Sequence, residues 1–375
     1  MNPPRRAQVV VIGGGPAGAS AALELARHGV ETLLLERSDG RGNPVGESLA
    51  PSANPLLHRL GLYDALAASG ALPCHGNRSS WGGDGALADH DFLRDPFGHG
   101  WHLDRPAFNA ALLDTVASAG VTLWLRSKAV SLEPTIRGWR IVVTTPSGSQ
   151  TLTADLLIDA TGRAAMVGRR QGVRRRVFDP LVAAVAFLPP GESSTCDATT
   201  LVEAAASGWW YTALLPDGKL AVAWFTDPDL LAHVGAWRAA AWWRLLEASG
   251  ATWERVAGHG ARRPETVRVM AAGSTLLRRV AGDRWIAAGD AAAAFDPLSS
   301  HGIGSALADG KKAATAVAAA LGGDETAIPA YVDHVVANYA RFLVVRRAYY
   351  AEERRWPAAP FWSRRQSDHG PRPLV

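Results

Sequence analysis

One stretch, from Val9 to Glu36, constrains the fold of this chain more than any other. It opens with four consecutive β-branched residues, which are typical of a buried parallel strand. A G-x-G-x-x-G pattern at Gly13, Gly15 and Gly18 then leads into a run of residues that favour helix. A second apolar run follows and ends at Glu36. This order of strand, glycine turn, helix, strand and acidic residue predicts a dinucleotide-binding βαβ unit.

The residue types of this unit fit a nucleotide diphosphate. The glycines allow a tight turn and let the backbone approach a pyrophosphate, while the helix N-terminus offers unpaired N–H groups and the positive end of its dipole. Glu36 is placed to accept a hydrogen bond from a ribose hydroxyl, and its charge would repel a 2′-phosphate. The unit therefore predicts FAD or NAD rather than NADP. A βαβ unit that binds no nucleotide is the structural alternative.

Composition and charge narrow the class of protein. Of the 375 residues, 47% are hydrophobic and 20% are charged, as in globular proteins. The formal net charge of +4 comes mainly from scattered arginines, so we expect no nucleic-acid partner. The two cysteines, Cys74 and Cys196, form no C-x-x-C pattern, which argues against a metal site and against a flavin disulfide reductase. No apolar run reaches the length of a membrane span and no signal sequence is evident, so we expect a cytoplasmic protein without a membrane partner.

The hydrophobic pattern changes along the chain. Before about Arg174 it predicts helices between short buried strands, one of them at residues 155–159. After Arg174 the pattern alternates, which is typical of an antiparallel sheet, and a strand at residues 284–288 then returns to the first pattern. Further helices are expected at residues 105–119, 230–248, 302–321 and 328–356.

This change of pattern predicts two interleaved domains. We expect the nucleotide-binding domain to comprise residues 1–72, 101–173 and 270–325. The antiparallel domain would comprise residues 73–100 and 174–269, and residues 326–375 would form a C-terminal helical segment.

A second segment, around residue 290, points to the same ligand. Gly289 and Asp290 end a strand, where a carboxylate and a small residue can hold a diphosphate or a ribityl chain. Residues 296–302 then turn into the N-terminus of another helix, whose amides can stabilise negative charge on the N1–C2=O edge of a reduced flavin. Two helix N-termini from distant parts of the chain fit FAD better than NAD.

These motifs resemble those of a known superfamily. The segments GGGPAG with its later Glu36, LLIDATG and GDAAAAFDP are similar to those of the FAD-dependent aromatic monooxygenases and tryptophan halogenases, over residues 7–325. Within that group, VGESLAPSANPLLHRLGL, GHGWHLDRPAFN and DPLSSHGIGSAL resemble the flavoprotein maturases that hydroxylate a peptidyl tryptophan in tryptophylquinone cofactor biosynthesis. The resemblance implies the p-hydroxybenzoate hydroxylase-like α/β fold. In it a Rossmann-like FAD-binding domain of the glutathione reductase type is interleaved with a mostly antiparallel β-sheet substrate domain, followed by a C-terminal helix.

The resemblance also implies which residues form the site. Those that would bind FAD are Gly13, Gly15, Ala17, Gly18, Glu36, Arg37, Ser48, Arg105, Asp290, Pro297, Gly302 and Ile303. His301, in the flavin loop, is the candidate catalytic base or oxygen-orienting residue, and Glu47 of the G-E-S segment is the second catalytic candidate. Trp209, Trp210 and Tyr211 would wall the substrate cavity. The structural alternatives are a hydrogen-bonding histidine, a loop-capping carboxylate and an ordinary aromatic core.

The expected chemistry follows from the cofactor. Reduced FAD and O2 form a C4a-hydroperoxide whose distal oxygen is electrophilic and is attacked by an electron-rich ring such as indole. We therefore expect a monooxygenase that hydroxylates an aromatic ring, specifically a tryptophan of a peptide or protein precursor. The chain has no second G-x-G-x-x-G, so no tightly bound NAD(P)H is expected. NAD(P)H would reduce the FAD directly or through a separate flavin reductase.

Other functions fit part of the same pattern. A flavin-dependent halogenase and a small-molecule aromatic hydroxylase are alternatives, as is a non-catalytic flavoprotein maturation chaperone. Residues 75–82 contain no lysine where the resemblance to halogenases implies one, and Tyr211 replaces the second tryptophan of the halogenase W-x-W pattern, so halogenation is disfavoured. A peptide substrate predicts a wide cleft bordered by residues 73–100. The arginines of residues 346–365 predict either a docking surface for an acidic partner or a solvated helix face.

Overall fold

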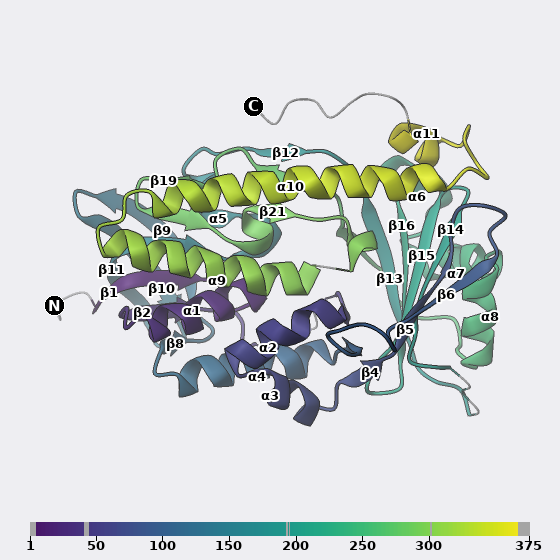
Figure 1. The fold of residues 1–375 in the computed structure, drawn as a ribbon, viewed down its shortest axis with the longest axis horizontal. Helices are drawn as coiled ribbons and strands as arrows, with labels where there is room; N and C mark the ends of the chain where they lie inside the picture. The colour runs from purple at the N-terminus through teal and green to yellow at the C-terminus, as the bar shows by residue number, and fades with distance from the viewer. Residues whose placement is uncertain (1–4, 41–44, 193, 195, 301, 367–375) are drawn as a thin grey trace.

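A computed structural model describes residues 5–40, 45–192, 194, 196–300 and 302–366 of the chain. Figure 1 shows two regions side by side, one around helices α1 and α9 and the other a fan of strands from β13 to β16. The long helix α10 (Ala327–Glu352) runs across both regions (Figure 1). Within the described ranges, no helix combines the length and the apolar character needed to cross a membrane.

The largest sheet contains the predicted βαβ unit. Within the described residues it has eight strands, of which β20, β11, β1, β2 and β8 pair in parallel in that order. Its strands are β1 (Arg5–Ile12), β2 (Thr32–Leu35), β8 (Thr122–Trp124), β9 (Lys128–Thr135), β10 (Gly138–Thr145), β11 (Gly148–Asp159), β19 (Ala281–Gly282) and β20 (Trp285–Ala287). The strand that comes first in the chain lies at the centre, as in dinucleotide-binding folds. Strand β11 is longer than predicted because its first half also pairs with β10.

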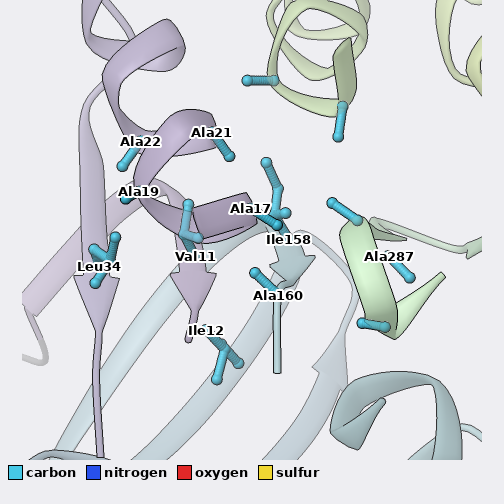
Figure 2. Packing of buried hydrophobic residues seen from close by; sticks show 14 of the residues in the cluster. Val11, Ile12, Ala17, Ala19, Ala21, Ala22, Leu34, Ile158, Ala160 and Ala287 are labelled. Carbon is cyan, nitrogen blue, oxygen red and sulfur yellow. The ribbon is translucent and has the colours of Figure 1, made fainter. Parts of the chain in front are cut away.

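Helix α1 (Pro16–Arg27) lies close to this sheet because the side chains between them are small. Its buried face consists largely of alanines, and Figure 2 shows these alanine side chains close to Val11 of the central strand. A Cβ on Gly18 would lie 1.8 Å from the carbonyl oxygen of Gly13, so the first turn of the helix requires glycine there. The sequence prediction of strand, glycine turn, helix and strand is confirmed.

The second large sheet is mostly antiparallel. Among the described residues it has seven strands in the order β17-β13-β16-β15-β14-β5-β6, and β14 with β5 is its parallel pair. Its strands are β5 (Gly76–Ser80), β6 (Leu87–Asp91), β13 (Val182–Leu188), β14 (Thr200–Ala205), β15 (Gly208–Leu214), β16 (Leu220–Thr226) and β17 (Arg268–Ala271). Strands from before and after residues 101–173 therefore meet in one sheet, which is what interleaved domains require. We keep the domain boundaries as a proposal, with β17 extending just beyond the one set at residue 269.

Helices α6, α7 and α8 cover one face of the antiparallel sheet. Trp242 of α7 and Val256 of α8 (Ala251–Gly258) belong to the same hydrophobic cluster as Trp210 of β15. The prediction of one helix over residues 230–248 is wrong. Helix α6 (Pro228–Val234) ends at Gly235, whose φ of 70° is left-handed and suits glycine, and α7 (Ala239–Glu247) begins after a short turn.

Helix α9 (Gly302–Leu321) has the predicted bounds and packs against α1. A Cβ on Gly310 would lie 2.0 Å from the carbonyl oxygen of Ala17, and the hydroxyl of Ser20 donates to the carbonyl of Leu307 at 2.7 Å. Helix α10 ends at Glu352 rather than at residue 356, and α11 (Pro360–Gln366) follows it.

Shorter elements complete the described fold. Two small sheets have the orders β3-β7-β4 and β12-β18-β21. Their strands are β3 (Ser48–Leu49), β4 (Leu72–Cys74), β7 (Gly100–His102), β12 (Arg175–Val177), β18 (Thr275–Leu277) and β21 (Ala293–Ala294). The remaining helices are α2 (Asn54–Leu60), α3 (Tyr63–Ala68), α4 (Arg105–Ser118) and α5 (Met166–Arg170). The predicted α/β class, with a Rossmann-like domain interleaved with a mostly antiparallel sheet and followed by C-terminal helix, is confirmed.

Candidate active site

A pocket lies between the Rossmann-like domain and the antiparallel sheet. Its described lining comes from the N-terminus of α1, residues 45–48, residues between 288 and 306, and one face of the antiparallel sheet. The N-termini of α1 and α9 both border the pocket, and neither of these two described helices has an acidic residue in its first turn. Both helix ends therefore present N–H groups and positive dipole ends to one space, which suits an anionic ligand.

Gly13 and Gly15 of the glycine motif meet different structural requirements. A Cβ on Gly13 would lie 2.3 Å from the carbonyl oxygen of Ala160, so packing within the chain excludes a side chain there. Gly15 has a φ of −72°, which any residue adopts, and a Cβ on it would meet no described atom within 4 Å. Gly15 nevertheless lines the pocket. A pyrophosphate against the backbone explains this glycine where packing does not, so the loop fits FAD.

Glu36 fastens the glycine loop to the end of β2. Its Oε2 accepts a hydrogen bond from the backbone N–H of Gly14 at 2.7 Å. Its Oε1 accepts from the backbone N–H of Ser38 at 2.8 Å and from the Ser38 hydroxyl at 2.6 Å. Ionised carboxylate oxygens have further lone pairs, so Glu36 can still accept from a ribose hydroxyl.

Asp290 lies in a strongly positive environment. The Nε of Arg163 is 3.6 Å from its Oδ2, and Arg175 donates to the backbone carbonyls of Asp290 and Ala291. Burial raises the pKa of the Asp290 carboxyl, and the charges of Arg163, Arg175 and Arg105 act against that rise. The cluster combines an oxygen acceptor with several cations, which suits the hydroxyl and phosphate groups of FAD.

Arg105 is a buried cation with a donor left over. Its Nη1 donates to the carbonyls of Val45 and Gly46, but its buried Nε has no hydrogen-bond partner among the described residues. Burial lowers the pKa of the guanidinium, and the charges of Glu47 and Asp290 act in the opposite direction. Buried donors are normally paired, so an orphaned one in the pocket lining fits a ligand that brings an oxygen acceptor.

Glu47 is a buried carboxyl group in the pocket wall. It is only 3% exposed, and its Oε1 accepts a hydrogen bond from the backbone N–H of Gly46 at 2.9 Å. Burial raises the pKa of Glu47, while this hydrogen bond and the charge of Arg105 oppose the rise. A carboxyl group with a raised pKa in a pocket is suited to proton transfer near neutral pH.

The three aromatic residues predicted to wall the cavity lie on two faces of β15. Side chains alternate along a strand, so Trp210 points away from Trp209 and Tyr211. Trp210 packs edge-on against Trp242, and Trp209 stacks on Phe225 with 3.9 Å between ring centroids. Of the three, Tyr211 alone belongs to the described lining of the pocket. The prediction that Trp209 and Trp210 wall the cavity is wrong, because both are core residues.

The other predicted site residues mostly meet at this pocket. Those in its described lining are Gly15, Ala17, Glu47, Ser48, Arg105, Asp290, Pro297, Gly302 and Ile303. Gly13, Gly18 and Glu36 are not in the lining but shape the adjoining glycine loop, and Arg37 is exposed at the end of β2. His301 lies outside the described residues, so its role as a base stays a prediction. Residues 73–100, expected to border the cleft, contribute nothing to the described lining.

Sequence reasoning missed two arginines of the site. Arg163 directly follows the LLIDATG motif, and its place just after β11 was a signal that a cation would meet the ligand there. Arg175 starts β12, and no local pattern in the sequence marks it. It reaches Asp290 only because the small sheet of β12, β18 and β21 brings the two segments together.

Two of the C-terminal arginines, Arg346 and Arg365, are held in ion pairs within the chain. Arg346 forms ion pairs with Asp179 and with Asp296, the latter at 2.8 Å. Arg365 pairs with Asp179 at 2.7 Å and with Asp227 at 2.6 Å. The side chains of Arg346 and Arg365 are 12% and 4% exposed, so these two form neither a docking surface nor a solvated face.

Comparisons with known proteins point to the same cofactor. The chain matches the FAD binding domain family over residues 6–338. It is 32% identical over 361 residues to a putative FAD-dependent oxidoreductase, LodB, of Marinomonas mediterranea, and the match covers 96% of each chain. It is 28% identical to a tryptophan 2-halogenase of Chondromyces crocatus, over 98% of this chain and 72% of the other.

A solved structure extends the comparison to the whole fold. The structure of QhpG, described as a peptidyl tryptophan dihydroxylase essential for tryptophylquinone cofactor biogenesis, superposes with a TM-score of 0.78 at 26% identity. The match covers 99% of this chain and 81% of QhpG. The resemblance to FAD-dependent monooxygenases and halogenases is thereby confirmed.

Proposed function

The chain belongs to the FAD binding domain family and is an FAD-dependent oxidoreductase, and from this premise we propose that it hydroxylates an aromatic ring. The ring that we propose is that of a tryptophan within a peptide or protein precursor. The composition of the pocket carries the proposal. One part of its described lining fits FAD, and the part from the antiparallel sheet is apolar except for Tyr211. An apolar wall beside a flavin suits a planar, electron-rich ring.

Two of the similar proteins support an aromatic substrate. The solved structure of QhpG is that of a peptidyl tryptophan dihydroxylase, and the Chondromyces crocatus relative is a tryptophan 2-halogenase. Both names specify tryptophan, although the reactions differ. This shared substrate supports tryptophan for the present chain, and the similarity to QhpG supports a peptide-bound one.

The halogenase relative favours a second candidate function, in which the ring is halogenated. The resemblance to halogenases implies a lysine near residues 75–82, and this segment has none. The described lining of the pocket also contains no lysine; its charged side chains are Glu47, Arg105, Arg163, Asp290 and Asp296. We therefore place hydroxylation ahead of halogenation.

The residues of the chain have distinct tasks in the proposed reaction. Bound FAD, reduced by NAD(P)H directly or through a separate flavin reductase, supplies with O2 an electrophilic oxygen for the ring. The two helix N-termini and Arg105 hold the anionic parts of the cofactor. The apolar sheet face excludes water from the ring, and Glu47 accepts the proton that the ring loses when it regains aromaticity.

Mass spectrometry of a peptide substrate tests the proposal. FAD-loaded protein is incubated with NADH, a flavin reductase, O2, chloride, bromide and a tryptophan-containing peptide of a candidate partner. We expect fragment ions that carry one or two added oxygen atoms on the tryptophan. The same peptide with phenylalanine in place of tryptophan is the matched control and should stay unmodified. Halogenated tryptophan would support the second candidate, and binding of an unmodified partner without flavin would support a chaperone.

A further inference from the structure

A chain of four hydrogen bonds runs from the pocket wall through a buried histidine to a backbone carbonyl. The phenol oxygen of Tyr211 and the Ser48 hydroxyl are 2.6 Å apart, and Ser48 is 3.3 Å from the Thr200 hydroxyl. Thr200 in turn is 2.9 Å from Nε2 of His102, whose Nδ1 is 2.8 Å from the carbonyl oxygen of Leu214. We call this series the Tyr211 chain. Its residues come from four strands, β3, β7, β14 and β15, so the pairing of these strands sets the distances between them.

The direction of the hydrogen bonds is fixed from the buried end. The Leu214 carbonyl can only accept, so Nδ1 of His102 carries a proton and donates it. His102 is fully buried, and burial lowers its pKa to about 4, so the imidazole is neutral at physiological pH. Its Nε2 therefore has only a lone pair, and the Thr200 hydroxyl must donate to it.

The same logic continues to the pocket. Because the Thr200 proton points to His102, the Thr200 oxygen is an acceptor for Ser48. The nearby thiol of Cys74 does not compete for it, since it is 3.9 Å from Thr200 and donates to the Gly76 carbonyl at 3.3 Å. The Ser48 oxygen then accepts from the phenol of Tyr211, which is the stronger donor of the two. The phenol proton of Tyr211 is therefore donated to Ser48, and the phenol oxygen offers only lone pairs to a ligand in the pocket.

Tyr211 is the polar position on an otherwise apolar wall. The other described residues that the antiparallel sheet contributes to the lining are alanine, valine, methionine and phenylalanine. Burial raises the pKa of the Tyr211 phenol, and so does the charge of Glu47, so the phenol stays protonated at neutral pH. A single oriented acceptor on an apolar wall discriminates between ligands by whether they bring a donor.

We propose that Tyr211 is a specificity-determining residue that accepts a hydrogen bond from an N–H or O–H group on the aromatic ring of the substrate. The inference rests on the proposed function, because it assumes that the sheet side of the pocket receives an aromatic ring. The indole N–H of tryptophan is such a donor. A ring of the same shape with an acceptor atom at that place would face the lone pairs of Tyr211 and leave them unpaired.

Indole and benzofuran provide the direct test, because they have nearly the same size and differ in an N–H replaced by an ether oxygen. Equilibrium dialysis gives the dissociation constant of each probe with the FAD-loaded wild-type protein, without turnover. We expect indole to bind about tenfold more tightly, the size of effect expected for one buried acceptor left unpaired. Equal affinity of the two probes would overturn the proposal.

Three variants separate the hydrogen bond from a structural effect. In Tyr211→Phe the ratio of the two affinities should fall to about one, whereas a purely structural role would weaken both probes alike and keep the ratio. In Thr200→Val the Ser48 hydroxyl is free to donate to Tyr211, the phenol proton can turn to the pocket, and the preference for indole should fall. Thr212→Val is the matched control: Thr212 lies beside Tyr211 on β15, and its buried hydroxyl has no partner among the described residues. This variant should keep the tenfold ratio.

The outcomes distinguish this proposal from the proposed function. A tenfold ratio that persists in Tyr211→Phe would overturn the role of Tyr211. The affinity ratio could depend on Tyr211 while the tryptophan peptide stays unmodified after turnover. This result would support the hydrogen bond to Tyr211 and would contradict only the proposed hydroxylation. Flavin content and melting temperature of each variant show that it is folded, and the wild-type comparison needs no variant.

Discussion

Gly15 lines the pocket at a point where the chain leaves space that its own atoms do not fill. We expect Gly15→Val to fold but to lose bound FAD almost completely, because its side chain occupies the place of the pyrophosphate. Gly15→Ala should give an intermediate loss. The flavin absorbance of the purified protein and its circular dichroism measure these two effects. Gly18→Val is the contrasting variant and should impair folding itself, since a Cβ there meets the Gly13 carbonyl at 1.8 Å. Full flavin occupancy in Gly15→Val would remove the reason for assigning this loop to FAD.

The raised pKa of Glu47 makes a prediction about stability and pH. Because the folded state binds this proton more tightly than the unfolded state, the stability that Glu47 contributes is complete below its ordinary pKa of 4.5 and is lost as the pH rises through the folded pKa. Glu47→Gln removes that loss, so the variant should melt at a higher temperature than wild type at pH 8. The difference should shrink steadily towards pH 5. Glu254→Gln, on the exposed side of α8, should change the melting temperature little at either pH. A pH-independent difference for Glu47→Gln would contradict the assignment.

At the scale of elements, α10 holds the turn that precedes α9. The Oδ1 of Asp296 accepts from the backbone N–H of Leu298, and its Oδ2 accepts from Arg346 at 2.8 Å and from the Tyr350 hydroxyl at 2.9 Å. One carboxylate therefore joins the pocket loop to the long helix. The shape of this loop therefore depends on its contacts with α10 as well as on its own sequence.

Arg346→Met tests this connection. It leaves the buried carboxylates of Asp179 and Asp296 without one of their cations, which typically costs about 3–5 kcal/mol. We expect a large fall in the midpoint of urea unfolding and a faster loss of FAD on dilution. Arg341→Met, at an exposed position of the same helix, is the control and should stay within about 0.5 kcal/mol of wild type. Equal stability of the two variants would show that the ion pairs do not hold the loop.

Local patterns predicted the elements that depend on nearby residues. The βαβ unit and the bounds of α9 follow from glycine spacing and from helix-forming runs, which act within a few residues. The break at Gly235 was missed because the apolar periodicity continues on both sides of it. The Tyr211 chain and the ion pairs of Arg346 were out of reach, since they join strands and helices that are distant in the sequence. The same limit explains Trp209 and Trp210, whose burial depends on what covers each face of β15.

At the scale of the whole molecule, the pocket lies between two domains, and its lining comes from segments that are far apart in the sequence. FAD-fitting residues come from the Rossmann-like domain, and the apolar wall comes from the antiparallel sheet. Helix α10 crosses both, and α11 adds Arg365, which pairs with Asp179 and Asp227. Figure 1 shows this helix lying along both regions, so α10 packs outside the pocket against the domains on either side of it.

The size of the substrate is the last prediction. If the ring belongs to a peptide, contacts of the remaining peptide supply the binding energy that orients it, and free tryptophan lacks those contacts. We expect the wild-type protein to oxygenate a partner peptide far more efficiently than free tryptophan, with a kcat/KM at least about 100-fold higher. Because Arg346 and Arg365 are committed to internal ion pairs, they cannot steer an acidic peptide, and moderate salt should change the peptide rate little. Initial rates with both substrates at low and moderate salt check both statements. Efficient turnover of free tryptophan would leave a small-molecule monooxygenase, and a steep fall with salt would point to docking charges other than Arg346 and Arg365.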